Sequence, residues 1–160
     1  RPDLCVILPV APGLRQRVED QVASVGGLPG LKLIDGQSHA ALAACDLTLV
    51  ASGTATLEAA LFKRPMVIAY HMHPLSWWLT HRKQLQPWVG LPNILANEFL
   101  VPELLQDQAE PEALCQALEA WLDESQRIPA LIRRFESMHQ NLMGDTSRVC
   151  ADAIEKILAS

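Results

Sequence analysis

The chain has 160 residues, of which 49% are hydrophobic and 19% are charged, and its formal net charge is −5 at pH 7. These values are typical of one globular domain with a sizeable core, and they exclude a disordered chain. The acidic balance argues against a nucleic-acid-binding protein, and we expect neither a membrane-spanning helix nor a signal peptide.

The first ninety residues or so alternate between predicted strands and helices. Residues 4–10 form a short, continuous apolar run, which is typical of a strand covered on both faces. A helix is expected from Pro12, since proline suits a first helical turn. The alternation continues to residue 86, with strands at 31–35, 46–51 and 65–71 and helices at 12–25, 39–45, 54–63 and 74–86.

Short connections between alternating strands and helices predict a doubly wound, Rossmann-like α/β domain with a parallel sheet. Open sheets of this kind bind ligands beyond the carboxyl ends of their strands. After residue 93 the pattern is helical, with helices expected at 94–99, 111–123, 127–142 and 145–159. We therefore expect residues 1–160 to form one domain, with 111–160 as a helical segment packed on it.

The charge is unevenly distributed along the chain. Residues 1–58 carry a net charge of −2, residues 59–97 carry +4 and residues 98–160 carry −7. The middle stretch has no Asp or Glu, yet it holds three of the five histidines and three of the four tryptophans. This acid-free stretch is compatible with a local anionic partner.

The four cysteines, Cys5, Cys45, Cys115 and Cys150, are far apart and form no CxxC pair. Each has apolar neighbours, so we expect buried free thiols of a reduced compartment rather than disulfides or metal ligands. Because the chain begins without a methionine and enters a strand almost at once, we also expect it to be part of a longer protein.

The stretch VASGTATLEAAL at residues 50–61 takes the chain from a strand to a helix through small and hydroxyl-bearing residues. Glycine lets a ligand approach the backbone, and the first turn of a helix offers unpaired N–H groups and a positive dipole end. Such a turn suits a phosphate or diphosphate, although an ordinary Ser/Thr-capped helix would have a similar sequence. The candidate residues are Ser52, Gly53, Thr54, Ala55 and Thr56.

Glu58 follows this turn closely. If Thr54 caps the helix, the capping-box position is Leu57, so Glu58 is not part of a capping box. It lies four residues after Thr54, on the same face, and its side chain leans toward the helix start. A carboxylate there could accept hydrogen bonds from a sugar diol, or it could simply be an acid placed favourably near the helix dipole.

Three motifs, ASGTATLEAAL, PMVIAYHMHPLSWWL and VGLPNILANEFLVPELLQ, resemble the lipid-A-disaccharide synthase family of inverting glycosyltransferases with the two-domain GT-B fold. The resemblance runs from about residue 4 to about residue 157. SGT followed by Glu also occurs in related nucleotide-sugar transferases and epimerases. The chain departs from the family pattern at His71, where an arginine is frequent.

The resemblance implies that the chain is the carboxyl-terminal, donor-binding half, and that the amino-terminal acceptor domain is absent. The donor would be UDP-2,3-diacylglucosamine and the acceptor 2,3-diacylglucosamine 1-phosphate (lipid X), with no metal or cofactor. The isolated domain would be inactive. The donor half of another UDP-sugar GT-B enzyme, a UDP-N-acetylglucosamine epimerase, and a non-catalytic nucleotide-binding module are the alternatives.

The resemblance also implies roles for single residues. The 52–56 turn would bind the diphosphate and Glu58 the ribose hydroxyls, while Gly36, at another strand end, would lie near the uracil. Asn93 would reach the donor sugar or its phosphate and is the tentative catalytic residue of this half. Its alternative role is the N-cap of the helix expected from Ile94.

Residues 73–83, HPLSWWLTHRK, combine aromatic and basic side chains. Because both substrates are acylated, we expect Trp77, Trp78, Arg82 and Lys83 to contact the anionic inner-membrane surface, with the protein cytoplasmic and peripheral on that membrane. Alternatively, the tryptophans pack against the absent domain. The histidines outside the acid-free stretch, His39 and His139, are expected at the surface.

Overall fold

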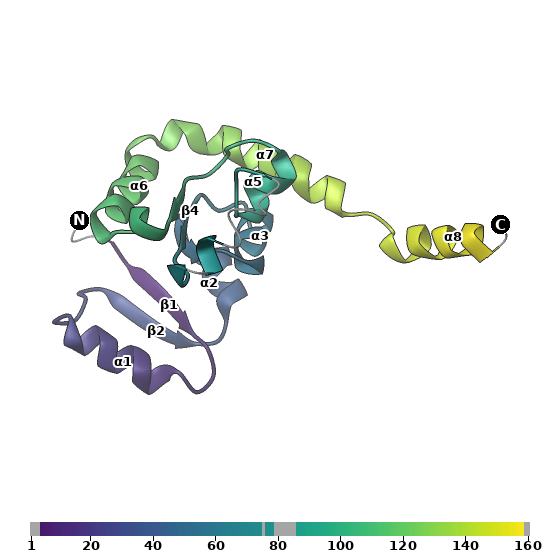
Figure 1. Cartoon of the computed structure of the whole chain (residues 1–160). Helices are drawn as coiled ribbons and strands as arrows, with labels where there is room; N and C mark the ends of the chain where they lie inside the picture. The colour runs from purple at the N-terminus through teal and green to yellow at the C-terminus, as the bar shows by residue number, and fades with distance from the viewer. Residues whose placement is uncertain (1–3, 75, 79–85, 159–160) are drawn as a thin grey trace. The chain divides into compact units, whose positions relative to one another are not determined.

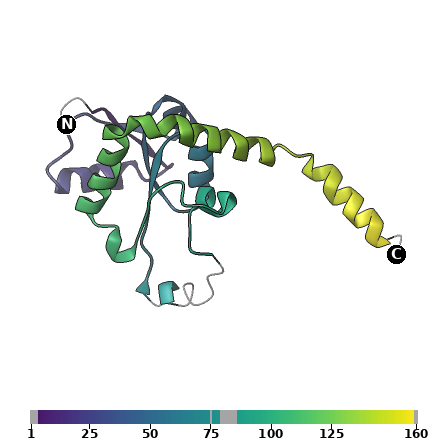
Figure 2. The ribbon, with the colours of Figure 1, turned by 90° about the horizontal axis from the view of Figure 1, so that it is seen from above.

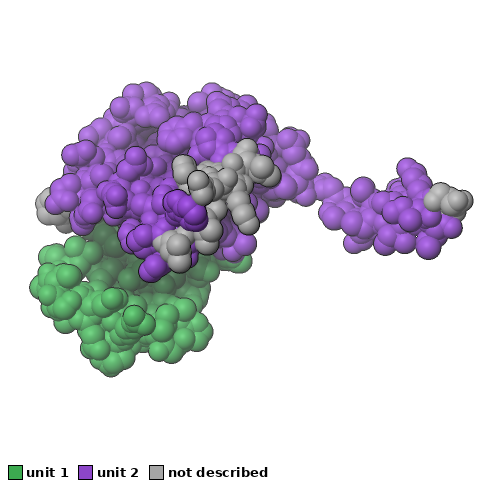
Figure 3. Space-filling model, in the orientation of Figure 1, with its two compact units in different colours: residues 1–48 green, residues 49–160 purple. Residues whose placement is uncertain are grey.

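The computed structural model describes residues 4–74, 76–78 and 86–158 (Figure 1). The chain forms two compact units, residues 1–48 and residues 49–160, which Figure 3 distinguishes by colour. Strands and helices alternate as far as residue 70, and the strands with a defined register are parallel. The predicted α/β class with parallel sheets is therefore confirmed.

The first unit is built around two strands. β1 (Val6–Val10) and β2 (Leu31–Asp35) pair in parallel, with Val6 opposite Leu31 and Val10 opposite Asp35. The crossover between them is α1 (Arg15–Ser24), and α2 (Ser38–Ala44) follows β2. A parallel pair needs a crossover of this kind, because a tight turn can join only antiparallel strands.

Arg15 ties α1 to the end of β2. Its guanidinium binds Glu19 Oε1 at 2.7 Å and Asp35 Oδ2 at 3.1 Å. Both hydrogen bonds raise the pKa of Arg15, and the bond to Glu19 has the larger effect. The three side chains are exposed, so the contribution of these ion pairs to stability is small.

Within the first unit, residues 4–10 are not covered on both faces as expected. Val6, Ile7 and Leu8 keep 36–39% of their surface exposed. The reason is that α1 buries none of its residues and β1 belongs to a two-stranded sheet. A continuous apolar run therefore predicted the strand correctly but not the layers that cover it.

The second unit contains a three-stranded sheet in the order β3-β4-β5. Its strands are β3 (Thr48–Ala51), β4 (Met66–Tyr70) and β5 (Glu103–Leu105), and β4 and β5 are parallel, with Ile68 opposite Glu103. The sequence pattern after residue 93 predicted helices only, so β5 was missed. Three residues are too few to show a period of two, and the strand is defined by its partner β4.

Gln106, directly after β5, extends this pairing by means of its side chain. Its amide accepts a hydrogen bond from Met72 N at 2.7 Å and donates one to Met72 O at 2.9 Å. The side-chain amide thus occupies the place of a strand peptide beside the end of β4. Gln106 itself has a positive φ of 50°, which ends the strand and starts the 3₁₀ helix η1 (Gln106–Gln108).

Most of the other described elements of the second unit are helices. Those predicted at 111–123, 127–142 and 145–159 are confirmed, whereas the helix predicted at 94–99 begins earlier, at Leu91. The helix predicted at 54–63 ends at Leu61, because Lys63 adopts a left-handed conformation with φ 59°. The helices are α3 (Thr54–Leu61), α5 (Leu91–Ala96), α6 (Pro111–Asp123), α7 (Ile128–Leu142) and α8 (Thr146–Leu158), and the 3₁₀ helix η2 (Ser125–Arg127) joins α6 to α7 (Figure 2).

The core of the second unit lies between β4 and the helices. Met66, Val67 and Ile68 of β4 and Phe135 of α7 are fully buried. Trp121 fixes α6 to β4, because its indole N–H donates to Met66 O at 3.1 Å. By contrast, α8 has no buried residue.

Two expectations about single residues are corrected. None of the four cysteines is in a disulfide, but none is buried as expected: Cys45 is half-buried, and Cys5, Cys115 and Cys150 are exposed, since they lie before β1, on α6 and on α8. His39 is exposed as expected, whereas His139 is half-buried, with Nδ1 2.6 Å from Lys63 Nζ.

No helix in the described part of the chain is long and apolar enough to cross a membrane.

Candidate functional site

The strand-to-helix turn predicted at residues 52–56 lies between the end of β3 and the start of α3. Gly53 is the N-cap of α3, and Gly53, Thr54 and Ala55 are exposed. Within the described residues, no acceptor is recorded for the amides of these three residues. An exposed set of N–H groups at the positive end of a helix is chemically suited to bind an anion.

Gly53 has a backbone conformation, φ 134° and ψ −163°, that is almost restricted to glycine. We predict that Gly53→Ala lowers the free energy of unfolding by about 1–3 kcal/mol through backbone strain alone, since no atom lies within 4 Å of the added Cβ. Urea denaturation of the variant measures this change.

Gly144→Ala is the matched control for this substitution. A Cβ at Gly144 also meets nothing within 4 Å, but this glycine does not have a left-handed φ. We expect its stability to stay within about 0.5 kcal/mol of the original. Equal effects of the two substitutions would mean that the turn is not strained.

The hydroxyl groups of the turn have different roles. Ser52 Oγ donates to Val89 O at 3.2 Å, and Thr56 Oγ1 donates to Gly53 O at 2.7 Å. Thr56 is fully buried, and its amide also donates to Gly53 O at 3.1 Å. In this conformation the hydroxyls of Ser52 and Thr56 are therefore used inside the protein, whereas Thr54 is exposed, and a contact of all three hydroxyls with a ligand stays a prediction.

Glu58 lies on the second turn of α3 and is half-buried. The helix cap is Gly53 and not Thr54, so the capping-box position is Thr56. The prediction that Glu58 is outside a capping box holds, although for a different cap residue. Glu58 keeps its i+4 relation to Thr54, which places both residues on one face of the helix.

Residues 89–91 support the turn. Val89 O accepts the hydroxyl of Ser52, and Leu91 N donates to Thr56 Oγ1 at 3.3 Å. We call these residues the 89–91 segment. Through Ser52 and Thr56, this segment is bonded to both ends of the candidate turn.

Asn93 is fully buried and is not the N-cap of α5, because the helix already begins at Leu91. Its Nδ2 donates to Val101 O at 2.9 Å and to Glu103 Oε1 at 2.8 Å. Its Oδ1 accepts from Leu100 N at 2.8 Å and from Val101 N at 3.0 Å. In this conformation the whole amide is used to hold α5 to the chain before β5, and a direct contact with a sugar would break these bonds.

Glu103 was missed in the sequence. Its Oε2 accepts from Val89 N at 2.8 Å, and its Oε1 accepts from Gly90 N at 2.9 Å as well as from Asn93. The available signal was a single acid inside the apolar run FLVPELL. That signal gives no partner, because the amides it binds lie 13 and 14 residues earlier in the chain.

The remaining predicted residues belong to other parts of the chain. Gly36 follows β2 with φ 63° and belongs to the first unit, whereas the other candidates belong to the second. Trp77 is half-buried and Trp78 is 52% exposed. Arg82 and Lys83 lie outside the described residues.

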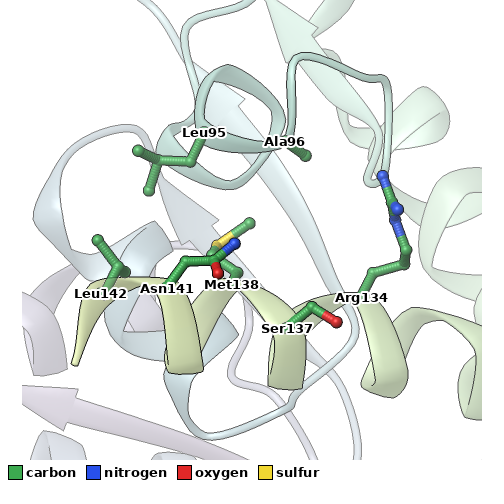
Figure 4. A pocket seen from close by; sticks show the side chains of 7 residues that line it. All are labelled: Leu95, Ala96, Arg134, Ser137, Met138, Asn141 and Leu142. Carbon is green, nitrogen blue, oxygen red and sulfur yellow. The ribbon is translucent and has the colours of Figure 1, made fainter. Parts of the chain in front are cut away.

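A pocket of about 220 Å³ lies between α5 and α7. Leu95 and Ala96 line it on the α5 side (Figure 4). The α7 side is lined by Arg134, Ser137, Met138, Asn141 and Leu142. None of the candidate residues lines this pocket, so we retain the exposed turn as the candidate site.

Among the described residues, no three His, Cys, Asp or Glu side chains are grouped so that they could hold a metal ion. Ligand binding without a metal stays a prediction, because a metal ion can also be held by groups other than these four side-chain types.

The alternating elements, parallel strands and exposed strand-to-helix turn define an α/β protein with a candidate anion site at a helix start. A family model described as lipid-A-disaccharide synthetase matches residues 1–154. The chain belongs to this family.

Relatives named lipid-A-disaccharide synthase support the assignment. The chain is 56% identical to that of Verminephrobacter eiseniae over 99% of its own length and 42% of the relative's. It is 53% identical to the synthase of Albidiferax ferrireducens, over 98% of this chain and 41% of the relative. It is 49% identical to the synthase of Pseudomonas savastanoi, over 99% of this chain and 40% of the relative. The chain thus spans about two fifths of the curated relatives it matches.

Proposed function

We propose that the chain is the donor-binding half of a lipid-A-disaccharide synthase, a metal-independent inverting glycosyltransferase of lipid A biosynthesis. The donor is UDP-2,3-diacylglucosamine and the acceptor is lipid X. The observation that carries the proposal is the family match over residues 1–154. The exposed amides of Gly53, Thr54 and Ala55 supply a chemically suitable site for the donor diphosphate.

In the proposed reaction, the 6-hydroxyl of lipid X attacks the anomeric carbon of the donor. The bond from that carbon to the diphosphate oxygen breaks, the hydroxyl proton passes to a base in the other half of the enzyme, and UDP leaves. Negative charge grows on the diphosphate as the bond breaks. The amides of Gly53, Thr54 and Ala55 would stabilise this charge without having to reorganise.

The other roles follow from placement on α3 and from the family resemblance. The carboxylate of Glu58 accepts hydrogen bonds from the ribose hydroxyls of UDP, beside the diphosphate, and Gly36 lies near the uracil. The four hydrogen bonds of Asn93 support a positioning role for this residue rather than a direct contact with the sugar.

The proposed complex forms at the anionic inner-membrane surface, with the protein on its cytoplasmic side. The acid-free stretch 59–97 and the exposed Trp78 support this location. Tryptophan and basic residues are favoured at a membrane interface. Arg82 and Lys83 are the proposed basic contacts.

Titration calorimetry of the chain with UDP in the presence of EDTA tests the proposal. We expect weak but saturable binding on a sample that is folded by circular dichroism, and weaker binding of uridine, which lacks the diphosphate. We also expect no glycosyl transfer by the 160-residue chain alone. The absence of heat with millimolar UDP would refute the donor-binding role, and glycosyl transfer by the chain alone would refute the division between two halves.

A further inference from the structure

We infer that Glu103 is a positioning residue for the diphosphate turn, because its carboxylate holds the 89–91 segment to which both ends of the turn are bonded. The inference rests on the proposed function, since it assigns the residue that keeps the proposed site in shape. Glu103 itself does not touch the ligand.

The first step is the contact between Glu103 and the 89–91 segment. The two carboxylate oxygens accept the amides of Val89 and Gly90 at 2.8 and 2.9 Å, and Oε1 also accepts the side-chain amide of Asn93. Charge-assisted hydrogen bonds of this length are stronger than those between neutral groups. The 89–91 segment lies in the stretch 59–97, which contains no Asp or Glu of its own. Among the described hydrogen bonds, the carboxylate that accepts from its amides is that of Glu103 in β5.

The second step is the contact between the segment and the turn. The amide of Val89 donates to Glu103, and the carbonyl of Val89 accepts from the hydroxyl of Ser52. Leu91 donates its amide to Thr56, and the hydroxyl of Thr56 donates in turn to Gly53 O. A shift of the segment would therefore move both Ser52 and the N-cap of α3.

The third step is that this region has little room to relax. A Cβ on Gly90 would meet Ile68 Cδ1 and would lie 2.9 Å from Glu103 Oε1. Thr56 and Asn93 are fully buried. Close packing therefore holds these hydrogen bonds in one arrangement. If Glu103 is replaced, the neighbouring side chains have little room to adjust, and we expect the 89–91 segment and the turn to shift.

A carboxylate is required because all three of its partners are N–H donors. An ionised carboxylate only accepts hydrogen bonds, whereas a glutamine amide of the same size places an NH₂ group against one of these donors. Glu103→Gln therefore keeps the volume but leaves at least one of the three donors without an acceptor.

The test compares Glu103→Gln with Trp121→Phe, which removes the hydrogen bond to Met66 O far from the turn along the chain and keeps the aromatic packing. UDP affinity, urea stability and the ¹⁵N–¹H amide signals of residues 53–55 are measured for the 160-residue chain and both variants. We expect Glu103→Gln to weaken UDP binding about tenfold and to shift the amide signals. Trp121→Phe should lose stability and leave both other readouts unchanged.

The outcomes separate the inference from the proposed function. If the original chain binds UDP and Glu103→Gln matches Trp121→Phe in affinity and amide signals, the positioning role is refuted and the proposed function stands. If the original chain does not bind UDP, the proposed function fails, and the inference fails with it.

A second pair of variants keeps the test decisive if Glu103→Gln does not fold. Thr56→Ser keeps the hydroxyl that links Leu91 to Gly53, and Thr56→Val removes it at nearly constant volume. We expect UDP binding to persist in Thr56→Ser and to weaken about tenfold in Thr56→Val. Equal affinities of the two variants would refute the coupling between the segment and the turn.

Discussion

Glu58→Ala is expected to weaken UDP binding about 10- to 100-fold, because a carboxylate that accepts the ribose hydroxyls contributes about 1.5–3 kcal/mol per charged hydrogen bond. Inorganic pyrophosphate has no ribose. Its binding is expected to stay the same or become slightly tighter, since the substitution removes a negative charge near the start of α3. Calorimetric titration with both ligands measures the two changes.

Glu136→Ala is the control for the loss of an acid. Glu136 is exposed on α7 and does not belong to the candidate site. We expect its UDP affinity to equal that of the original chain. If Glu58→Ala weakened UDP and pyrophosphate equally, the ribose role would be wrong, although binding of the diphosphate at the turn would not be affected.

Phe135→Ala is expected to lower the free energy of unfolding by about 3–5 kcal/mol, because it leaves a cavity in a closely packed core. Phe135 lies in the middle of α7 and is fully buried. A loss of this size is comparable to the whole stability of many small domains. Urea denaturation followed by circular dichroism measures it.

Leu142→Ala is the matched control on the same helix. Leu142 is the last residue of α7 and is 45% exposed, so its removal should cost less than about 1 kcal/mol. Similar losses for the two variants would mean that Phe135 does not hold α7 in the core.

The elements with strong local signals could be predicted from the sequence. The helices α6 and α7 are long and amphipathic, and both begin with a proline in their first turn, so their periodicity located them closely. β5 has three residues and no period of its own. It is a strand because β4 lies beside it, and this information is not local.

The candidate site was predictable only in part for the same reason. The small residues before α3 indicate an open turn, since glycine and the helix start act locally. Which hydroxyls remain available depends on Val89 and on the buried position of Thr56. No spacing within the motif carries that information, and therefore the sequence could not show that the hydroxyls of Ser52 and Thr56 are bonded inside the protein.

The sequence by itself determined the α/β class, the exposed turn at Gly53 and the family, because these depend on local periodicity, on glycine geometry and on motifs. Only the tertiary structure decided that Glu103 reaches the amides of Val89 and Gly90, and that Asn93 uses its whole amide inside the protein. These contacts depend on which chain segments the fold brings within hydrogen-bonding distance, and a hydrogen bond requires a distance of about 3 Å that sequence spacing does not specify.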